Sequence, residues 1–255
     1  MPLVKKSSGN LKQFKVGDQT VSFYYIPDPD DINTTHASTW TFEDEEGVRQ
    51  QFWYPHIKKG DVVLDIGASF GSYTLSALAL GAEVYSFSPE HEFRKIRRSV
   101  EENRGFRQRC HIYNFGFHNA TGLFKTDSMA FFKVGEMSEA QVMQVNQNNI
   151  CGWYIPVKRL DDFVPTLNLE KIDFIKIDTE GAEFHILEGG LETLKKYKPK
   201  LMVEFHLFKD ASLQGRCEEL LKSIGYEGQS HAYHANNISH GFYVPGVPTT
   251  DAASA

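Results

Sequence analysis

Residues Asp65 to Thr74 bring a carboxylate, two glycines and several hydroxyl groups together in one short stretch, Asp-Ile-Gly-Ala-Ser-Phe-Gly-Ser-Tyr-Thr. A compact apolar run, Val62 to Ile66, precedes the glycines, and helical spacing begins near Ser72. In an open α/β sheet, ligands bind beyond the carboxyl ends of the strands, where glycine lets the backbone approach without an intervening Cβ. The stretch therefore predicts a ligand-binding turn between a strand and a helix.

The glycine spacing indicates which ligand this turn suits. Gly-x-x-x-Gly after an aspartate differs from the Gly-x-Gly-x-x-Gly of dinucleotide sites, and the chain has no Gly-x-x-x-x-Gly-Lys-[Ser/Thr] phosphate loop. An aspartate at the strand end suits an ammonium group or a backbone amide better than a pyrophosphate. S-adenosylmethionine carries an amino-acid end and a sulfonium but no phosphate, so it fits this turn better than a nicotinamide dinucleotide.

A second group of ionisable residues follows two later apolar runs. Asp178 ends the first run, Glu180 and Glu183 lie in the turn after it, and Glu204 and His206 share one side-chain parity in the second. These groups are expected to converge at the sheet edge that carries the glycine turn. Asp178 and Glu204 are poor core residues and are expected in a site, whereas a first-turn helical position explains Glu183 equally well.

Two chemistries could use this group. In the first, which we prefer, Asp178, Glu180 or His206 accepts the proton of a substrate hydroxyl. In the second, Asp178, Glu204 and His206 hold a divalent ion, and the oxygen-rich set suits Mg²⁺ or Mn²⁺ better than Zn²⁺. In both, most of the acceleration would come from aligning the hydroxyl with a methyl group for in-line displacement.

The elements that must position these residues alternate between short apolar runs and helical stretches from Asp61 onward. This alternation predicts an α/β fold with a mostly parallel central sheet and helices on both faces. Strands are expected at 20–26, 62–66, 83–87, 111–115, 172–177, 201–205 and 240–244, and helices at 41–58, 72–80, 90–104, 187–197 and 214–224. The expected organisation is an N-terminal extension (1–40), a main domain (41–245) with an insertion at 121–156 between the third and fourth strands, and a disordered tail (246–255).

The composition of the chain limits the classes of partner that are expected. The net charge is −6, which argues against nucleic acid as a main partner because phosphate binding needs a basic stripe. No apolar run approaches the roughly 20 residues that span a bilayer, so no membrane partner is expected. The three cysteines form no disulfide or zinc pattern, which favours a cytoplasmic location. The oligomeric state stays open.

Four ordered motifs resemble the FkbM family of methyltransferases. The glycine turn is similar to the family's Asp-hydrophobic-Gly-Ala-Asn-x-Gly-x-Tyr-Thr, with Ser69 for the asparagine. Residues 159–163, 174–183 and 198–206 resemble the family's Leu-Asp-Asp, Lys-Ile-Asp-x-Glu-Gly-Ala-Glu and Pro-x-hydrophobic-Glu-x-His elements. The resemblance spans about residues 52–206. It implies a Rossmann-like fold and methyl transfer from S-adenosylmethionine, usually to a hydroxyl of a sugar, polyketide or other secondary metabolite, so the expected partner is a small-molecule acceptor with a hydroxyl.

The resemblance also assigns cofactor contacts. The expected cofactor-binding residues are Asp65, Gly67, Ala68, Ser69, Gly71, Tyr73, Thr74, Ser88 and Glu90. Where the family has an acid that binds the ribose hydroxyls, this chain has Ser88, a weaker partner, and Glu90 is the other candidate for that contact. Because of Ser88, the alternative function is a non-catalytic cofactor-binding or regulatory protein. His231, His234 and His240 are expected in loops or at the surface.

Overall fold

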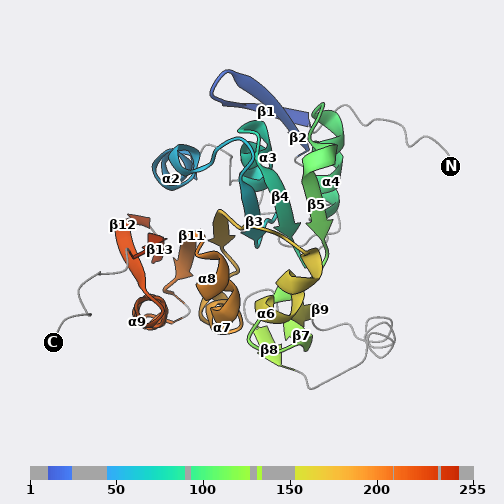
Figure 1. Ribbon diagram of the computed structural model, residues 1–255. Coiled ribbons are helices and arrows are strands. Elements are labelled where there is room, and N and C mark those ends of the chain that lie inside the picture. The colour runs from blue at the N-terminus through green and yellow to red at the C-terminus, as the bar shows by residue number, and fades with distance from the viewer. Residues whose placement is uncertain are drawn as a thin grey trace. The chain divides into compact units, whose positions relative to one another are not determined.

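The computed structural model (Figure 1) describes residues 11–24, 45–89, 93–126, 131–133, 153–208, 210–234 and 237–246. The chain divides into two compact units, residues 1–115 and 116–255. The earlier division into extension, main domain, insertion and tail stays a prediction. No helix among the described residues is long and apolar enough to span a membrane.

The first unit contains a parallel sheet of three strands in the order β3-β4-β5. These strands are β3 (Val62–Ile66), β4 (Glu83–Phe87) and β5 (Cys110–Tyr113). Every residue of β3 is buried, as expected for a parallel strand that is covered on both faces. The predicted bounds of β3 and β4 are confirmed, and β5 begins one residue earlier and ends two residues earlier than predicted.

Helices follow two of these strands, α3 (Ser72–Ala79) after β3 and α4 (Phe93–Glu102) after β4. The helix α2 (Glu46–Phe52) precedes β3 and passes into a short 3₁₀ turn, Tyr54–His56. Helix α2 is shorter than the predicted 41–58, because Pro55 lacks an N–H group and favours the tighter turn that follows. Residues 41–44 of that prediction lie outside the described residues.

An antiparallel hairpin precedes α2, formed by β1 (Leu11–Val16) and β2 (Gln19–Tyr24). Two backbone N–H groups of β2 donate hydrogen bonds to α4 and to the residue that follows it. The N–H of Tyr24 donates to the Ser99 hydroxyl at 2.8 Å, and the N–H of Ser22 donates to Asn103 Oδ1 at 2.9 Å. The sequence analysis placed a strand at 20–26 but missed β1, whose first three residues are all exposed.

Four strands of the second unit pair in the order β12-β13-β11-β10. They are β10 (Phe174–Ile177), β11 (Lys200–His206), β12 (Tyr226–His234) and β13 (Ile238–Pro245). Strands β10 and β11 are parallel, whereas β13 pairs antiparallel with both β11 and β12. The parallel pair was predicted, but β12 was not.

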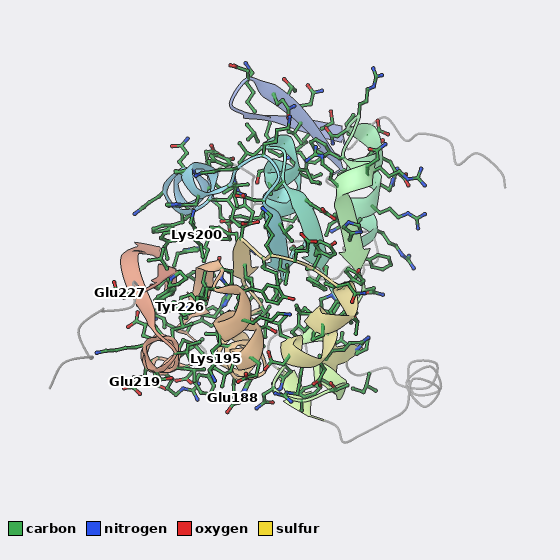
Figure 2. The ribbon with its side chains drawn as sticks, viewed as in Figure 1. Glu188, Lys195, Lys200, Glu219, Tyr226 and Glu227 are labelled. Carbon is green, nitrogen blue, oxygen red and sulfur yellow. The ribbon has the colours of Figure 1, made fainter. Side chains whose placement is uncertain are left out.

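The helices of this unit are α7 (Glu183–Glu188), α8 (Leu191–Tyr197) and α9 (Leu213–Ser223). One helix was predicted at 187–197, but Gly189 and Gly190 separate α7 from α8. A Cβ on Gly190 would lie 2.7 Å from a methyl group of Leu160, so a larger residue would not fit there. Charged side chains such as Lys195 and Glu219 (Figure 2) are exposed, whereas Leu194 and Cys217 of the same helices are buried.

A second, smaller sheet of four strands precedes β10, in the order β6-β9-β7-β8. Its strands are β6 (Gly116–Phe117), β7 (Gly122–Thr126), β8 (Phe131–Lys133) and β9 (Trp153–Lys158), and the short helix α6 (Leu160–Phe163) follows. Phe124, Ile155 and Val157 form its buried core. Strands β7 and β8 and the first part of β9 lie in the stretch predicted as an insertion, and residues 127–130 and 134–152 of that stretch lie outside the described residues.

Candidate functional site

The glycine turn begins directly after β3. Gly67 and Gly71 have φ angles of 82° and 93°, and Ser69 between them has a φ of 48°. These angles fall in the left-handed region that glycine adopts at little cost. The N–H groups of Gly67 and Ala68 both donate to the carbonyl of Phe87 at 3.0 Å, which holds the turn against the end of β4. The turn therefore has a defined backbone shape before any ligand binds.

Asp65 lies beneath this turn and is fully buried. Its Oδ2 accepts a hydrogen bond of 2.6 Å from the Thr74 hydroxyl, and the Ser86 hydroxyl lies 2.9 Å from the same Thr74 oxygen. Thr74 thus orients the carboxylate. The Tyr73 ring is also buried and packs edge-on against Trp53, with ring centroids 5.1 Å apart.

Ser88 immediately follows β4. It is buried, and its N–H donates to the carbonyl of Tyr113 at 3.1 Å, so its backbone is fixed beside the end of β5. Glu90, the other candidate for the ribose contact, lies outside the described residues. Whether any of the cofactor residues contacts a ligand stays a prediction.

The second unit holds the ionisable group that the sequence placed around Asp178. Asp178 follows β10, and its Oδ2 pairs with the ammonium group of Lys176 at 2.9 Å. Lys176 lies within β10 and is buried. The ammonium group therefore neutralises one side of the carboxylate and leaves Oδ1 to face the rest of the cluster.

Glu183 is the first residue of α7 and is fully buried. Its Oε1 accepts hydrogen bonds from the N–H groups of Thr179 and Gly181 at 3.1 Å and 3.0 Å, and from His206 Nδ1 at 3.0 Å. The predicted first-turn position of Glu183 is confirmed, and Glu183 also orients the histidine, while its role in a site stays a prediction.

Glu204 and His206 point to the same side of β11, as their parity predicted, and both are buried. Glu204 Oε2 accepts a hydrogen bond of 2.7 Å from Nε2 of His240, its partner across the β11–β13 ladder. The expectation that His240 lies at the surface or in a loop is wrong. The antiparallel pairing of β13 with β11 carries His240 into the interior, where it is 2% exposed.

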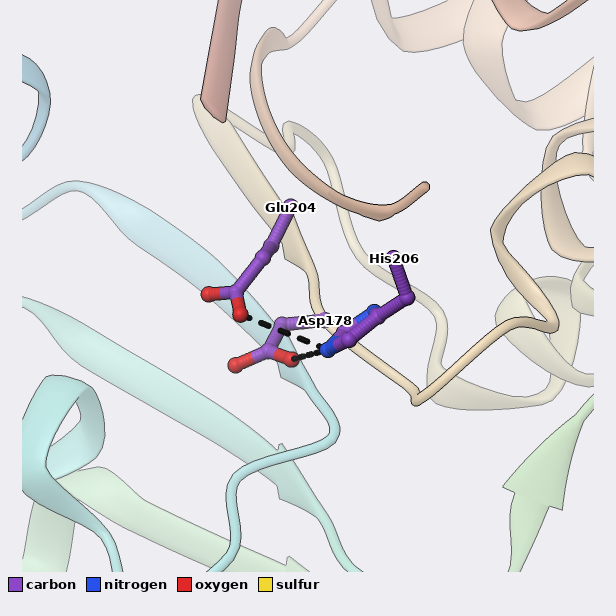
Figure 3. Close-up of side chains that lie close together, drawn as sticks. All are labelled: Asp178, Glu204 and His206. Atoms are coloured by element: carbon purple, nitrogen blue, oxygen red, sulfur yellow. Dashed lines mark ion pairs between the residues drawn. The ribbon is translucent and has the colours of Figure 1, made fainter. Parts of the chain in front are cut away.

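The side chains converge on Nε2 of His206 (Figure 3). Glu204 Oε1 lies 3.4 Å from this nitrogen, Glu180 Oε1 lies 3.5 Å from it and Asp178 Oδ1 lies 4.0 Å from it. Donor atoms of Asp178, Glu204 and His206 all lie within 4.8 Å of one another. The predicted convergence of these residues is confirmed within the second unit, and their approach to the glycine turn stays a prediction.

Burial and mutual charge give the members of the cluster different pKa values. Burial raises the pKa of Asp178 to about 6, and the Glu204 charge adds to this rise while Lys176 opposes it. Burial alone would lower the pKa of His206, but hydrogen bonds with the surrounding carboxylates outweigh burial and raise it well above its ordinary value. Burial would raise the pKa of Glu204, but hydrogen bonds from His206 and His240 hold it below its usual range.

Sequence reasoning did not single out two partners, Lys176 and His240. Lys176 belongs to the Lys-Ile-Asp motif, and its position two residues before Asp178 on the same strand face could have identified it. His240 had no such local signal, because its contact with Glu204, 36 residues earlier in the chain, depends on the pairing of β13 with β11.

Comparison with known proteins gives the family. The model of the methyltransferase FkbM domain matches residues 65–228, more than half of the chain. The chain therefore belongs to the FkbM methyltransferase family. A solved FkbM methyltransferase from Methylobacillus flagellatus KT superposes with a TM-score of 0.51 and 17% identity, covering 71% of this chain and 43% of that one. The protein has the α/β, Rossmann-like fold of these methyltransferases.

Two curated relatives match parts of this chain in sequence. The 2-O-methyltransferase NoeI of Sinorhizobium fredii is 28% identical over 54% of this chain and 61% of its own length. The AMB antimetabolite synthetase AmbE of Pseudomonas aeruginosa is 24% identical over 65% of this chain, but the match spans only 9% of that protein. The chain thus spans less than two thirds of each of these relatives.

Proposed function

We propose that this chain is an S-adenosylmethionine-dependent O-methyltransferase that acts on a hydroxyl of a sugar, polyketide or other secondary metabolite. The observation that carries the proposal is the cluster of a partly exposed Asp178 after β10 with the buried Glu204 and His206 on β11 of an FkbM domain. A group of carboxylates with a histidine can accept the proton of a hydroxyl. Burying carboxylates lowers stability unless they are paired, so a purely structural role does not account for the cluster well.

The glycine turn supplies the proposed cofactor site. Its backbone is partly exposed at Gly67 and Ser69, which suits close approach of the methionine and adenosine parts of S-adenosylmethionine, with Ala68 and Gly71 shaping the turn around them. Asp65, held by Thr74, supports the turn and supplies negative charge for the ammonium group of the cofactor. Ser88 follows the neighbouring strand, where a hydroxyl can reach the ribose.

The proposed reaction is an in-line displacement. An oxygen lone pair of the acceptor forms a bond to the methyl carbon, the bond from that carbon to sulfur breaks, and the sulfonium becomes the thioether of S-adenosylhomocysteine. The hydroxyl proton must leave in the same step or soon after it. In the absence of a metal, Asp178 is the best acceptor, because its pKa of about 6 leaves it ionised at neutral pH yet more basic than an ordinary carboxylate.

The neighbours of Asp178 have supporting roles in this proposal. His206 is held by Glu183 and carries a raised pKa, so it stabilises negative charge rather than accepting the proton. The Glu180 side chain is 65% exposed and lies 3.5 Å from His206, which suits it to meet an acceptor that arrives from solvent.

The names of the relatives support a hydroxyl acceptor. NoeI is named a 2-O-methyltransferase, and AmbE is named an antimetabolite synthetase, which fits the secondary-metabolite class. The alternative is a cofactor-binding or regulatory protein without activity, which the serine at position 88 favours.

An acceptor screen tests the proposal. The full chain would be incubated with S-adenosylmethionine and a panel of sugars and polyketides, and S-adenosylhomocysteine would be quantified by mass spectrometry. We expect acceptor-dependent release that falls strongly in Asp178→Asn and persists in Glu219→Gln, an exposed carboxylate on α9. Tight cofactor binding without turnover on any hydroxylated compound of the panel would favour the non-catalytic alternative.

A further inference from the structure

Three side chains of the cluster each present one donor atom to a common centre and engage their other polar atom elsewhere. Asp178 presents Oδ1 while Oδ2 pairs with Lys176 at 2.9 Å. Glu204 presents Oε1 while Oε2 accepts from His240 at 2.7 Å. His206 presents Nε2 while Nδ1 donates to Glu183 at 3.0 Å.

Metal sites in proteins commonly show this arrangement, in which each ligand side chain is oriented by a hydrogen-bonded partner. A histidine that binds a metal through one ring nitrogen usually donates the other N–H to a carboxylate, and a carboxylate ligand is usually hydrogen-bonded through its remaining oxygen. The outer partners Lys176, Glu183 and His240 are all buried, so they restrict the rotation of the three side chains that face the centre.

The spacing of the donor atoms around Nε2 suits a shared ion as well as weak hydrogen bonds. A charge-assisted N–H···O bond measures about 2.7–2.9 Å. The carboxylate oxygens of Glu204 and Asp178 lie 3.4 Å and 4.0 Å from Nε2 instead. Donor atoms about 2.1 Å from a shared ion lie about 3.0–3.4 Å apart when adjacent and about 4.2 Å apart when opposite.

The charges around the centre also accommodate a cation. Asp178, Glu183 and Glu204 bring three negative charges to the cluster, and Lys176 supplies one positive charge. A divalent cation would take the place of the proton on Nε2 of His206, since a metal-bound Nε2 must carry no proton.

We propose that Asp178, Glu204 and His206 bind one divalent cation. The two oxygens and one imidazole nitrogen suit Mn²⁺, which accepts carboxylates and histidine together, and three protein ligands leave positions open for water or substrate. The catalytic role of the ion rests on the methyl transfer proposed above. The ion would bind the acceptor oxygen and lower the pKa of its hydroxyl, and the proton would pass to the exposed carboxylate of Glu180.

Metal binding can be measured without any acceptor. The full chain, treated with EDTA and dialysed, would be titrated with Mn²⁺ and followed by electron paramagnetic resonance and by calorimetry. We expect saturable binding of one ion per chain. The near-isosteric variants Asp178→Asn and Glu204→Gln should each weaken it at least tenfold, and Glu219→Gln should leave it unchanged. Circular dichroism would establish that each variant is folded, and His206→Gln provides a third ligand variant if one of these fails to fold.

The outcomes separate this proposal from the proposed function. No saturable Mn²⁺ binding by the wild type, or binding that survives in the folded ligand variants, would overturn the metal site. If methyl transfer persists in EDTA and still requires Asp178, the metal proposal fails and the methyltransferase function stands. If Mn²⁺ binds as described but neither S-adenosylmethionine nor S-adenosylhomocysteine does, the metal site stands and the proposed function fails.

Discussion

The side chains around His206 show how position along a strand sets the role of a residue. Asp178, just past β10, keeps 21% of its side chain exposed and has a raised pKa, whereas Glu204, inside β11, is buried and has a lowered pKa. The difference arises because burial, with a smaller contribution from the Glu204 charge, raises the pKa of Asp178, whereas His206 and His240 lower the pKa of Glu204. Of these two carboxylates, Asp178 is therefore the one suited to meet a substrate.

Replacing Asp178 by asparagine tests its role in proton transfer or metal binding. Asparagine keeps the size of the side chain but removes its charge, so turnover should fall about 10²–10⁴-fold. The affinity for S-adenosylhomocysteine should stay within about twofold of the wild-type value, because the cofactor is assigned to the glycine turn. Steady-state kinetics and calorimetry check the two quantities, and wild-type turnover in the variant would place the chemistry on another residue.

Replacing Glu183 by glutamine tests the support of His206. An amide nitrogen at the Oε2 position would be buried where the described residues offer no hydrogen-bond partner. The unfolding free energy should fall by about 1–3 kcal/mol, and turnover should fall with it as the histidine loses its charged partner. Urea unfolding measures the first effect, with Glu219→Gln as the control. Unchanged stability and turnover would contradict the role of Glu183 in holding this turn.

Replacing Ser88 by glutamate tests the ribose contact. A charge-assisted hydrogen bond is worth about 1.5–3 kcal/mol against about 1 kcal/mol for a neutral one, so S-adenosylmethionine should bind more tightly. Because Ser88 is buried, the ligand-free variant should also be less stable than the wild type. Calorimetric titration and thermal melting measure both effects. Weaker cofactor binding would indicate that another group already fills this position.

The grouping of Asp178, Glu204 and His206 could be predicted from the sequence, because it depends on the position of each residue in or just after its own strand. Asp178 follows an apolar strand, and Glu204 and His206 share a parity, so each was placed from its own neighbours in the chain. The contact of His240 with Glu204 could not be predicted, because it depends on how β13 pairs with β11. Glycine, aspartate and serine in the turn were assigned by family resemblance, and their ligand contacts stay predictions.

At the scale of elements, short and mostly buried strands were predicted best. Strands β3 and β4 are short, buried runs with clear breaks, and their bounds matched those predicted. Strand β12 was missed because its sequence, Tyr-Glu-Gly-Gln-Ser-His-Ala-Tyr-His, lacks β-branched residues and contains a glycine. The break between α7 and α8 was missed because the tight packing that excludes a side chain at Gly190 involves Leu160, which is distant in sequence.

The role of the glycine turn, which joins β3 to α3, can be tested by replacing Gly67. Gly67→Val should abolish cofactor binding, because the new side chain would occupy the approach path of the ligand. Its φ of 82° also imposes strain of about 1–3 kcal/mol on any other residue. The milder Gly67→Ala separates the two effects when compared with Gly105→Ala, since Gly105 has a φ of 86° and open space around its Cα.

Both alanine variants should lose similar stability in thermal melting, and only Gly67→Ala should lose affinity for S-adenosylhomocysteine, by at least tenfold. Unchanged affinity in a folded Gly67→Ala variant would remove the turn from the cofactor site.

At the scale of the whole molecule, the glycine turn proposed as the cofactor site and the carboxylate cluster lie in different compact units, 1–115 and 116–255. The proposed function requires ligand contacts in the first unit and proton transfer or metal binding in the second. A ligand that binds the folded state and not the unfolded state should stabilise the chain by mass action. The stabilisation is about 2.7 kcal/mol at a ligand concentration 100 times the Kd.

A melting experiment can therefore identify the cofactor class without an acceptor. S-adenosylmethionine and S-adenosylhomocysteine should raise the melting temperature in a concentration-dependent way, and NAD(H) at equal concentration should not. The reverse pattern would favour a nicotinamide-dependent oxidoreductase and would remove the basis of the methyl-transfer reaction.

The most direct test of methyl transfer to a hydroxyl follows the methyl carbon itself. The full chain would be supplied with S-adenosylmethionine that carries a ¹³C-labelled methyl group and with the best acceptor from the screen, and the product would be analysed by NMR spectroscopy. We predict one ¹³C methyl group bonded to an acceptor oxygen, one S-adenosylhomocysteine for each methyl group transferred, and strongly reduced product with Asp178→Asn. Label on carbon or nitrogen, or equal labelling by wild type and variant, would contradict this account of the site.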